Sequence, residues 1–117
     1  MAATKRNGWV EEYPGAITVC DRTGLILELN KVAVKSFHAV GGRKLIGSNL
    51  MDCHPEPARN KLKRMMRNRQ TNVYIVKKGR TRKIILQTPW YKKNRYSGFV
   101  EISLPITGKI PSIDRNS

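Results

Sequence analysis

The segment from Asp52 to Pro57 holds the residue types that are most able to do chemistry, because a His directly follows an Asp and a Cys. Carboxylate, thiolate and imidazole groups are all metal ligands, and a closed zinc site needs four of them around one ion. The sequence has only one other His, His38, so it offers few ligands to complete a metal site. His54 is therefore a weak metal candidate, and a structural role near the start of a helix is the favoured interpretation.

The remaining reactive residues do not form a recognisable catalytic set. Cys20 lies in an apolar, β-branched segment and is expected to be buried and inert, whereas Cys53 is expected to be a small hydrophobic residue at a helix end. One disulfide is conceivable, but two cysteines without a close spacing favour a reduced intracellular protein. No carboxylate pair, nucleophile–base set or glycine-rich phosphate loop stands out. We expect that the chain is not an enzyme.

A basic segment runs from Arg59 to Arg95 and contains fourteen Lys and Arg residues without any Asp or Glu. The whole chain of 117 residues has 23 basic and 8 acidic residues, which gives a formal net charge of +15. Such a charge attracts polyanions, acidic proteins or anionic membrane surfaces, and it should make stability sensitive to salt. Aromatic residues near this segment could stack on nucleic-acid bases, but no helix-turn-helix, zinc-finger or RNA-binding signature is present. The alternative interpretation is a helix and loops that Lys and Arg keep solvated.

The apolar pattern of the N-terminal half predicts a hairpin followed by a helix. Residues 16–21 and 25–29 indicate two strands, and the four residues from Asp21 to Gly24 are typical of a tight turn. Asn30 is typical of a helix N-cap, and a helix is expected from there to about His38.

The C-terminal half predicts a longer helix and three strands. A helix is expected over 55–69, with Asp52 or, less favoured, His54 as its cap and one apolar stripe facing the core. Strands are expected over 72–76, 83–90 and 98–104, with turns at 78–79 and 92–94.

The length fits a single domain, which we place at residues 12–105 between an N-terminal segment (1–11) and a C-terminal tail (106–117). The first eight residues lack the apolar stretch of a signal peptide, and no segment approaches the roughly 20 apolar residues that span a bilayer. The expected location is the cytoplasm.

The order of these elements and several residues resemble a PAS domain. Asn30 matches the Asn that opens the first helix of that family, and Ala33 and Phe37 match the buried face of the helix. The other matching segments are Pro14-Gly15-Ala16-Ile17, Val19-Cys20-Asp21, Gly24-Leu25-Ile26, Leu45-Ile46-Gly47-Ser48-Asn49-Leu50 (similar to the family's iGxxl loop) and Gly98-Phe99-Val100. The resemblance covers roughly residues 12–105. It implies an α+β fold with a five-stranded antiparallel sheet flanked by short helices and one longer helix.

The resemblance also implies a ligand pocket between the sheet and the long helix. The expected lining residues are Leu62, Met66, Tyr74, Ile85, Gln87, Phe99 and Glu101. The apolar members could simply fill the core, so the polar Gln87 and Glu101 are the better indicators of a pocket. A change of one residue in strand parity would turn both of these side chains outward instead.

The resemblance gives no clear cofactor. Haem-binding PAS domains use a His on the long helix, and the corresponding residues 58–62 contain none, so haem through His54 is disfavoured. A flavin photosensor of this fold needs an Asn-Cys-Arg-Phe motif, which residues 49–53 do not provide.

The expected function is that of a stand-alone sensory or signalling module that binds a small ligand or a protein partner. A homodimer is expected, with contacts at Trp9, Val10 and Tyr13 and on the exposed apolar face of the sheet. A signalling protein is the expected partner, because no output domain is recognised in the sequence. Two alternatives stay open: a basic nucleic-acid-binding protein built on the same fold, and a haem-dependent gas or redox sensor.

Overall fold

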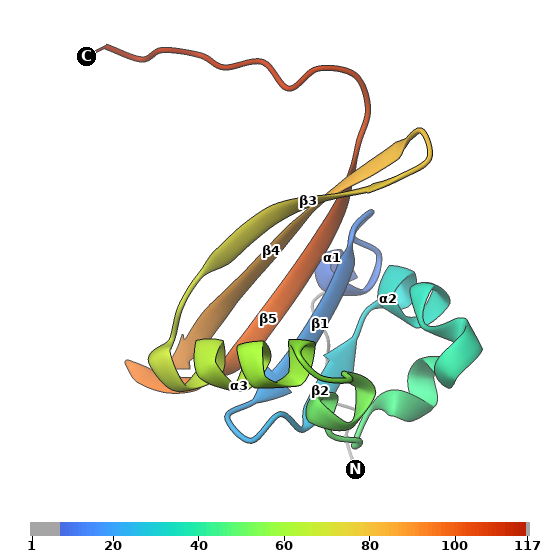
Figure 1. The fold of residues 1–117 in the computed structure, drawn as a ribbon, viewed down its shortest axis with the longest axis vertical. Coiled ribbons are helices and arrows are strands. Elements are labelled where there is room, and N and C mark those ends of the chain that lie inside the picture. Colours follow the sequence, from blue (N-terminus) through green and yellow to red (C-terminus); the bar gives the residue numbers. More distant parts are fainter. Residues whose placement is uncertain (1–7, 117) are drawn as a thin grey trace.

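The computed structural model describes residues 8–116 and contains a five-stranded antiparallel sheet (Figure 1). Its strands are β1 (Ala16–Asp21), β2 (Ile26–Leu29), β3 (Asn72–Lys78), β4 (Thr81–Lys92) and β5 (Arg95–Ile106), and their spatial order is β2-β1-β5-β4-β3. The last strand in the chain therefore lies in the centre and joins the N-terminal hairpin to β4 and β3. The expected α+β fold is confirmed.

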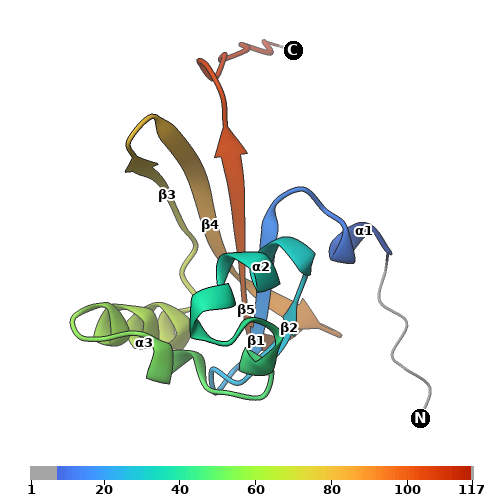
Figure 2. The ribbon, with the colours of Figure 1, turned by 90° about the vertical axis from the view of Figure 1, so that its right-hand side faces the viewer.

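The helices are short except for one. They are α1 (Gly8–Glu11), α2 (Lys31–Ser36), the 3₁₀ turns η1 (His38–Val40), η2 (Gly42–Leu45) and η3 (Leu50–Cys53), and the longer α3 (Ala58–Asn68). Figure 2 shows α2 and α3 on one side of the sheet and α1 on the other. The predicted apolar stripe of α3 is present, because Leu62, Met65 and Met66 are its buried residues.

The three C-terminal strands are longer than the sequence pattern indicated. β3 and β4 continue through Lys78 and Thr81, so their hairpin extends past the helical layer (Figure 1). In that part of the sheet neither face of β3 is buried. An alternation of apolar and polar residues is therefore not required there, and the sequence pattern does not indicate the strand. Backbone pairing continues there without it, since ladder hydrogen bonds do not depend on side-chain polarity.

The start of α3 also differs from the expectation. Neither Asp52 nor His54 caps this helix, because both lie in or next to η3 and the N-cap position is Pro57, which makes no side-chain cap. The carboxylate of Glu56 accepts a hydrogen bond from the amide of Asn60 (3.0 Å) and so satisfies one donor of the first turn.

Two clusters of buried side chains form the core, and Leu50 packs against both. The first cluster joins α3 to the sheet through Cys20, Leu62, Met65, Met66 and Phe99. The second holds α2 on β2 through Ile26, Leu29 and Ala33. Both thiols are free; Cys20 is buried as expected, whereas the expectation of Cys53 as a small hydrophobic residue is wrong, because it is exposed on η3.

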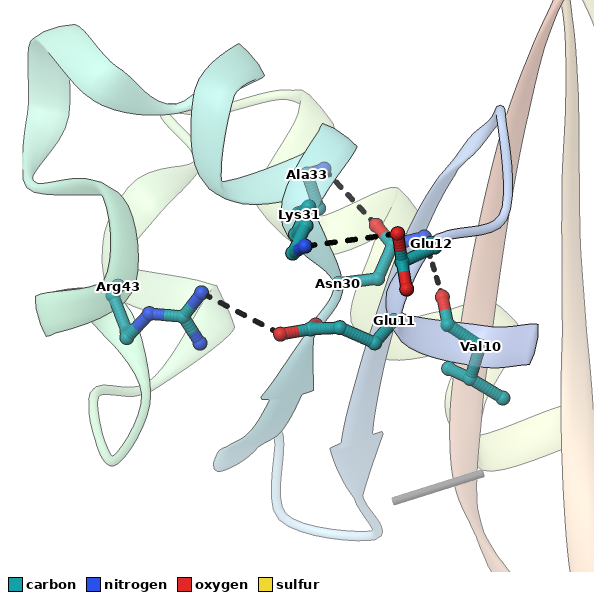
Figure 3. Close-up of polar contacts among 7 residues, drawn as sticks. All are labelled: Val10, Glu11, Glu12, Asn30, Lys31, Ala33 and Arg43. Atoms are coloured by element: carbon teal, nitrogen blue, oxygen red, sulfur yellow. Dashed lines mark hydrogen bonds and ion pairs between the residues drawn. The ribbon is translucent and has the colours of Figure 1, made fainter. Parts of the chain in front are cut away.

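Asn30 is completely buried, and its side chain makes four hydrogen bonds. Its Oδ1 accepts hydrogen bonds from the amides of Ile17 (2.9 Å) and Ala33 (3.0 Å), and the second of these is the predicted N-cap. Its Nδ2 donates to the carbonyl groups of Val10 and Gly15, both at 2.9 Å. One side chain thus joins α1, the start of β1 and the start of α2, and Figure 3 shows its bonds to Val10 and Ala33.

Candidate functional site

A cavity of about 550 Å³ lies between the two core clusters, where the sheet faces η1, η2 and η3. This volume falls within the range of small-molecule sites. The side chains around it are mostly apolar. The lining residues are Thr18, Cys20, Ile26, Phe37, Val40, Leu45, Leu50, Asp52, Cys53, His54, Leu62, Gln87, Phe99, Val100 and Glu101.

Polar side chains cross the cavity wall in a single row. The strand register places Asn72 opposite Gln87, Gln87 opposite Glu101, and Glu101 opposite Thr18. Because side chains alternate between the two faces of a strand, this register turns the whole row toward the helical layer. Gln87 and Glu101 therefore face the cavity, and the parity that would have turned them outward is excluded.

The hydrogen bonds along this row point in one direction. Asn72 Nδ2 donates to Gln87 Oε1 (3.2 Å), and Gln87 Nε2 donates to Glu101 Oε2 (2.7 Å). The amide of Gln87 is thereby oriented, and the carboxylate of Glu101 becomes the acceptor at the end of the chain of donors. Burial, followed by the negative charge of Glu101, raises the pKa of the Tyr74 phenol above its usual value.

The charges around the cavity are opposite in sign to those of the whole protein. Among the described residues that line it, two are carboxylates, Asp52 and Glu101, and none is Lys or Arg. His54 adds an imidazole whose Nδ1 lies 2.9 Å from the carbonyl oxygen of Leu50. When this nitrogen donates to the carbonyl, Nε2 is left as the acceptor of the neutral ring.

A second cavity of about 350 Å³ adjoins the first and shares His54, Leu62, Gln87 and Glu101 with it. It extends along α3 toward the edge strand β3. The residues that it adds are Ala58, Lys61, Met65, Asn72 and Tyr74.

The structure brings five of the seven expected pocket residues to these cavities. Four line the larger one, namely Leu62, Gln87, Phe99 and Glu101, and Tyr74 lines the smaller. Ile85 is buried without lining either cavity, and Met66 points toward a different hollow. Whether any of them binds a ligand stays a prediction.

Sequence reasoning missed the cavity wall that comes from residues 37–53. Phe37, Val40, Leu45 and Leu50 lie in or beside short 3₁₀ turns. Such turns are too short to show a helical period. The available signal was the run of apolar residues at 45–46 and 50–51, but a local run of apolar residues does not indicate the space that they enclose.

A separate hollow of about 310 Å³ is lined by cations. Arg22 comes from the β1–β2 turn, and Lys63, Arg67 and Arg69 come from α3 and its C-terminus. The ring of Tyr96 forms part of the wall, with the guanidinium of Arg69 4.9 Å from its centroid. This hollow could hold an anionic group beside an aromatic face.

The structure divides the basic segment between two ends of the sheet. Figure 1 shows α3 beside the β4–β5 turn at one end, whereas the β3–β4 turn projects from the other. Lys63 and Arg67 consequently lie far from Lys78 and Arg80, although all four belong to one run in the sequence.

The donor groups around the cavity do not favour a metal or a haem. In residues 8–116, no three His, Cys, Asp or Glu side chains are grouped so that they could hold a metal ion. α3 carries no His, and the carboxylates of Asp52 and Glu101 would oppose the propionates of a haem. Within the same residues, no helix is long and apolar enough to cross a membrane.

Comparison with solved structures identifies the fold. The PAS domain of BvgS from Bordetella pertussis is 16% identical, with a TM-score of 0.64 over 86% of this chain and 82% of that one. The PAS domain of an HTR-like protein from Haloarcula marismortui is 13% identical, with a TM-score of 0.59 over 84% and 91%. The chain has the PAS-domain fold. No protein-family model and no curated protein sequence matches it.

A PAS domain with a named ligand is also among the similar structures. The Aer2 receptor from Vibrio cholerae, described as a dual PAS-haem oxygen sensor, is 18% identical, with a TM-score of 0.57 over 80% of this chain and 95% of that one. Identities this low establish the shared fold, so the chemistry of this chain has to be argued from its own cavity.

The outer face of the sheet is apolar, half-buried on β4 and β5 and exposed on the edge strand β3. Two cross-strand rows follow from the register, Val73–Leu86–Ile102 and Ile75–Ile84–Leu104. Val73 is 53% exposed and Ile75 is 46% exposed. Of the three expected dimer residues, Trp9 is exposed and meets the ring of Tyr13 edge-on, and Val10 is half-buried. Their role in a dimer stays a prediction.

Proposed function

We propose that this PAS domain is a sensory or signalling module that binds a small ligand in its 550 Å³ cavity. The observation that carries the proposal is the polar row from Asn72 to Glu101, which brings ordered polar groups to a mostly apolar wall. A wall that served only as core would gain nothing from these groups, because buried polar side chains must be satisfied at some cost. A cavity of this size with few, oriented polar groups is the arrangement that small-molecule sites share.

The route from the cavity to the N-terminal segment passes through η2. Leu45 lines the cavity, and Arg43, two residues earlier in the same turn, lies with Nη2 3.8 Å from Glu11 Oε2. Lys31 of α2 makes a second ion pair with Glu12, at 3.8 Å (Figure 3). A ligand that displaces Leu45 would move Arg43 relative to α1. Ligand binding would then favour one position of α1 over another, as a shift between two populations.

The output of this shift would be pairing with a second copy or with a signalling protein in the cytoplasm. α1 carries Trp9 and Val10, and the apolar outer face of the sheet lies on the same side of the molecule. Exposed apolar surface of this kind marks protein interaction sites. Movement of α1 would change which part of that surface is available.

The test is to look for a bound ligand and to fill the cavity. Protein freshly purified under native conditions, and again after incubation with cell metabolites, is examined by native mass spectrometry, by its ultraviolet–visible spectrum and by extraction. Leu45→Trp places a larger side chain at the cavity wall, and Leu27→Trp is the matched control because Leu27 is exposed on β2 and does not line the cavity.

We expect added mass in the wild type and in Leu27→Trp but not in Leu45→Trp. Retention of the same compound by Leu45→Trp would place it elsewhere. A wild-type protein that shows neither added mass nor thermal stabilisation after incubation would contradict the ligand-binding function.

The second candidate function, nucleic-acid binding, is favoured by the cation-lined hollow between α3 and the β1–β2 turn. Its basic groups could contact phosphates while Tyr96 stacks on a base. Binding of a fluorescent single-stranded oligonucleotide should then weaken steeply between about 50 and 200 mM salt. Arg67→Glu should weaken it far more than Arg80→Glu, which makes the same charge change at the other end of the sheet. Equal effects of both variants would indicate nonspecific attraction by the net charge.

A further inference from the structure

We infer that the ligand of the cavity carries an amine or a similar cationic N–H group, which binds to the carboxylate of Glu101. The inference rests on the proposed ligand-binding function and names the chemical class of the ligand. Two independent observations support it: the sign of the charges around the cavity, and the direction of the hydrogen bonds that end at Glu101.

The charges of the cavity wall are the first observation. The chain has 23 basic and only 8 acidic residues, yet two of the acids line the larger cavity and, among residues 8–116, no Lys or Arg does; Lys61 lines only the smaller, adjoining cavity. At the wall itself, the nearest charges therefore favour a cation and oppose a carboxylate or phosphate. These wall charges outweigh the Lys and Arg side chains outside the cavities, whose effect salt screens over about 8–10 Å, and Lys61 at the smaller cavity is itself exposed to solvent.

The hydrogen bonds of the polar row are the second observation. Asn72 donates to Gln87, and Gln87 donates through Nε2 to Glu101 Oε2, so the only NH₂ group of Gln87 already serves this carboxylate. An ionised carboxylate accepts several hydrogen bonds and donates none. A ligand that meets the row at Glu101 must therefore supply a donor, and a positively charged N–H group makes the stronger bond.

The rest of the wall defines the body of the ligand. Ile26, Phe37, Leu45 and Phe99 surround the space beside the polar row and offer apolar and aromatic contacts. A molecule that satisfies both parts has an apolar or aromatic body and one amine at its end. Arylalkylamines are the simplest members of this class.

The experiment uses two matched sets of probes and the full chain. The first set is tryptamine, tryptophol and indole-3-acetate, and the second is benzylamine, benzyl alcohol and benzoate. Within each set the body is constant and the polar end is a cation, a neutral alcohol or an anion. Dissociation constants are measured by calorimetry at about 150 mM salt and neutral pH, where surface attraction of the anions by the +15 chain is weakened.

We expect that the amine of at least one set binds about tenfold more tightly than its alcohol, and that the acid binds most weakly, as loss of a charge-assisted hydrogen bond implies. Glu101→Gln should remove most of this preference while leaving the affinity for the alcohol within about twofold. Glu28→Gln is the control, because it removes the same charge from β2 at a residue that does not line either cavity. It should leave the preference for the amine unchanged.

The outcomes separate this inference from the proposed function. If the alcohols or acids bind as tightly as the amines, or if Glu101→Gln keeps the preference, the amine assignment is overturned and the ligand cavity stands. If no probe of either set binds and the native protein also retains no small molecule, both proposals are overturned. Before the comparison, circular dichroism should show that Glu101→Gln is folded. If it is not, Asp52→Asn, which removes the other carboxylate of the wall at an exposed residue, should weaken the preference, and an unchanged preference would overturn the inference.

Discussion

At the scale of single residues, Asn30 does more than cap a helix, because its side chain also holds α1 and the start of β1. Each of its four hydrogen bonds joins a different backbone group, and three of them reach back, to Val10 of α1 and to Gly15 and Ile17 at the start of β1. A carboxylate can replace the accepting Oδ1 but not the donating Nδ2. The Asn side chain is thus required for the attachment of α1 as well as for the start of α2.

Asn30→Asp should therefore destabilise the fold by about 3 kcal/mol, because the carbonyl groups of Val10 and Gly15 would lose their donor and face a buried charge. Denaturant unfolding measures the loss, and hydrogen exchange should show that α1 loses protection first. Asn49→Asp is the control: Asn49 is half-buried, and its Nδ2 makes one bond, to Thr23, so its cost should stay below about 1 kcal/mol. Equal costs at the two positions would contradict the role assigned to Asn30.

Asp21 makes stability depend on acid pH. Desolvation acts to raise the pKa of this carboxyl, but hydrogen bonds from the Thr23 side chain and from the amides of Leu25, Thr23 and Gly24 outweigh it, so the pKa lies below its usual value of 3.8. A lowered pKa means that the folded state holds the proton less tightly than the unfolded state does. The contribution of Asp21 is therefore complete above pH 3.8 and is lost as the pH falls below it.

This dependence is measured by comparing the wild type with Asp21→Asn between about pH 2 and 6. The wild type should be the more stable protein at the upper end of this range, and the difference should shrink as the pH falls through the lowered pKa. A difference that is independent of pH would contradict the assignment.

At the scale of elements, β1, β5 and β4 come into close contact at Gly98. This residue has φ +148°, and a Cβ placed on it would overlap the carbonyl oxygen of Cys20. The same carbonyl accepts a hydrogen bond from Trp90 Nε1 (3.0 Å), next to the irregularity in the β4–β5 register. The central strands can approach one another here because Gly98 has no side chain.

Gly98→Ala should cost about 3 kcal/mol of stability, because it adds overlap with a backbone atom to an unfavourable φ. Gly79→Ala in the β3–β4 turn is the matched control, since Gly79 has φ +60° but its added Cβ would meet nothing within 4 Å, and it should cost about 1 kcal/mol. Thermal and denaturant unfolding of both variants decide whether the overlap matters.

The outer face of the sheet allows a direct test of homodimer formation. Ile75→Lys should lower the mass measured by sedimentation from that of a dimer toward that of a monomer, because it places a charge in the apolar face. Val76→Lys is its control on the same strand: Val76 is 41% exposed, close to the 46% of Ile75, but points to the opposite face. If Val76→Lys dissociates the dimer equally, the contact is not made by the outer face.

At the scale of the whole molecule, a net charge of +15 should make stability rise with salt. Lys and Arg side chains far outnumber the acids that could pair with them, so most of the positive charges have only other positive charges to interact with. Self-repulsion then opposes folding until salt screens it. The melting temperature should increase between about 10 and 300 mM sodium chloride.

The Lys78→Glu/Lys93→Glu double variant lowers the net charge by about four and should show a smaller increase of the melting temperature with salt. Lys78→Arg/Lys93→Arg keeps the charge and should match the wild type. An increase that is the same for both variants would indicate a general salt effect instead of charge repulsion.

The sequence alone determined the elements that local rules control. The β1–β2 hairpin, the Asn30 cap and the apolar stripe of α3 follow from turn chemistry, hydrogen-bonding side chains and the helical period, each within a few neighbouring residues. Their order along the chain, together with the residues that resemble the family's motifs, predicted the PAS fold.

Only the tertiary structure decided which side chains share the cavity. The row from Asn72 to Glu101 exists because β5 pairs with both β1 and β4, and a shift of one residue in that register would turn the row to the outer face. The packing of η3 and α3 on the sheet also places Asp52 and Glu101 on a wall that has no Lys or Arg among residues 8–116, and the β3–β4 hairpin divides the basic segment between two ends of the sheet. These properties depend on contacts between residues that are far apart in the chain, so no local pattern could have reported them.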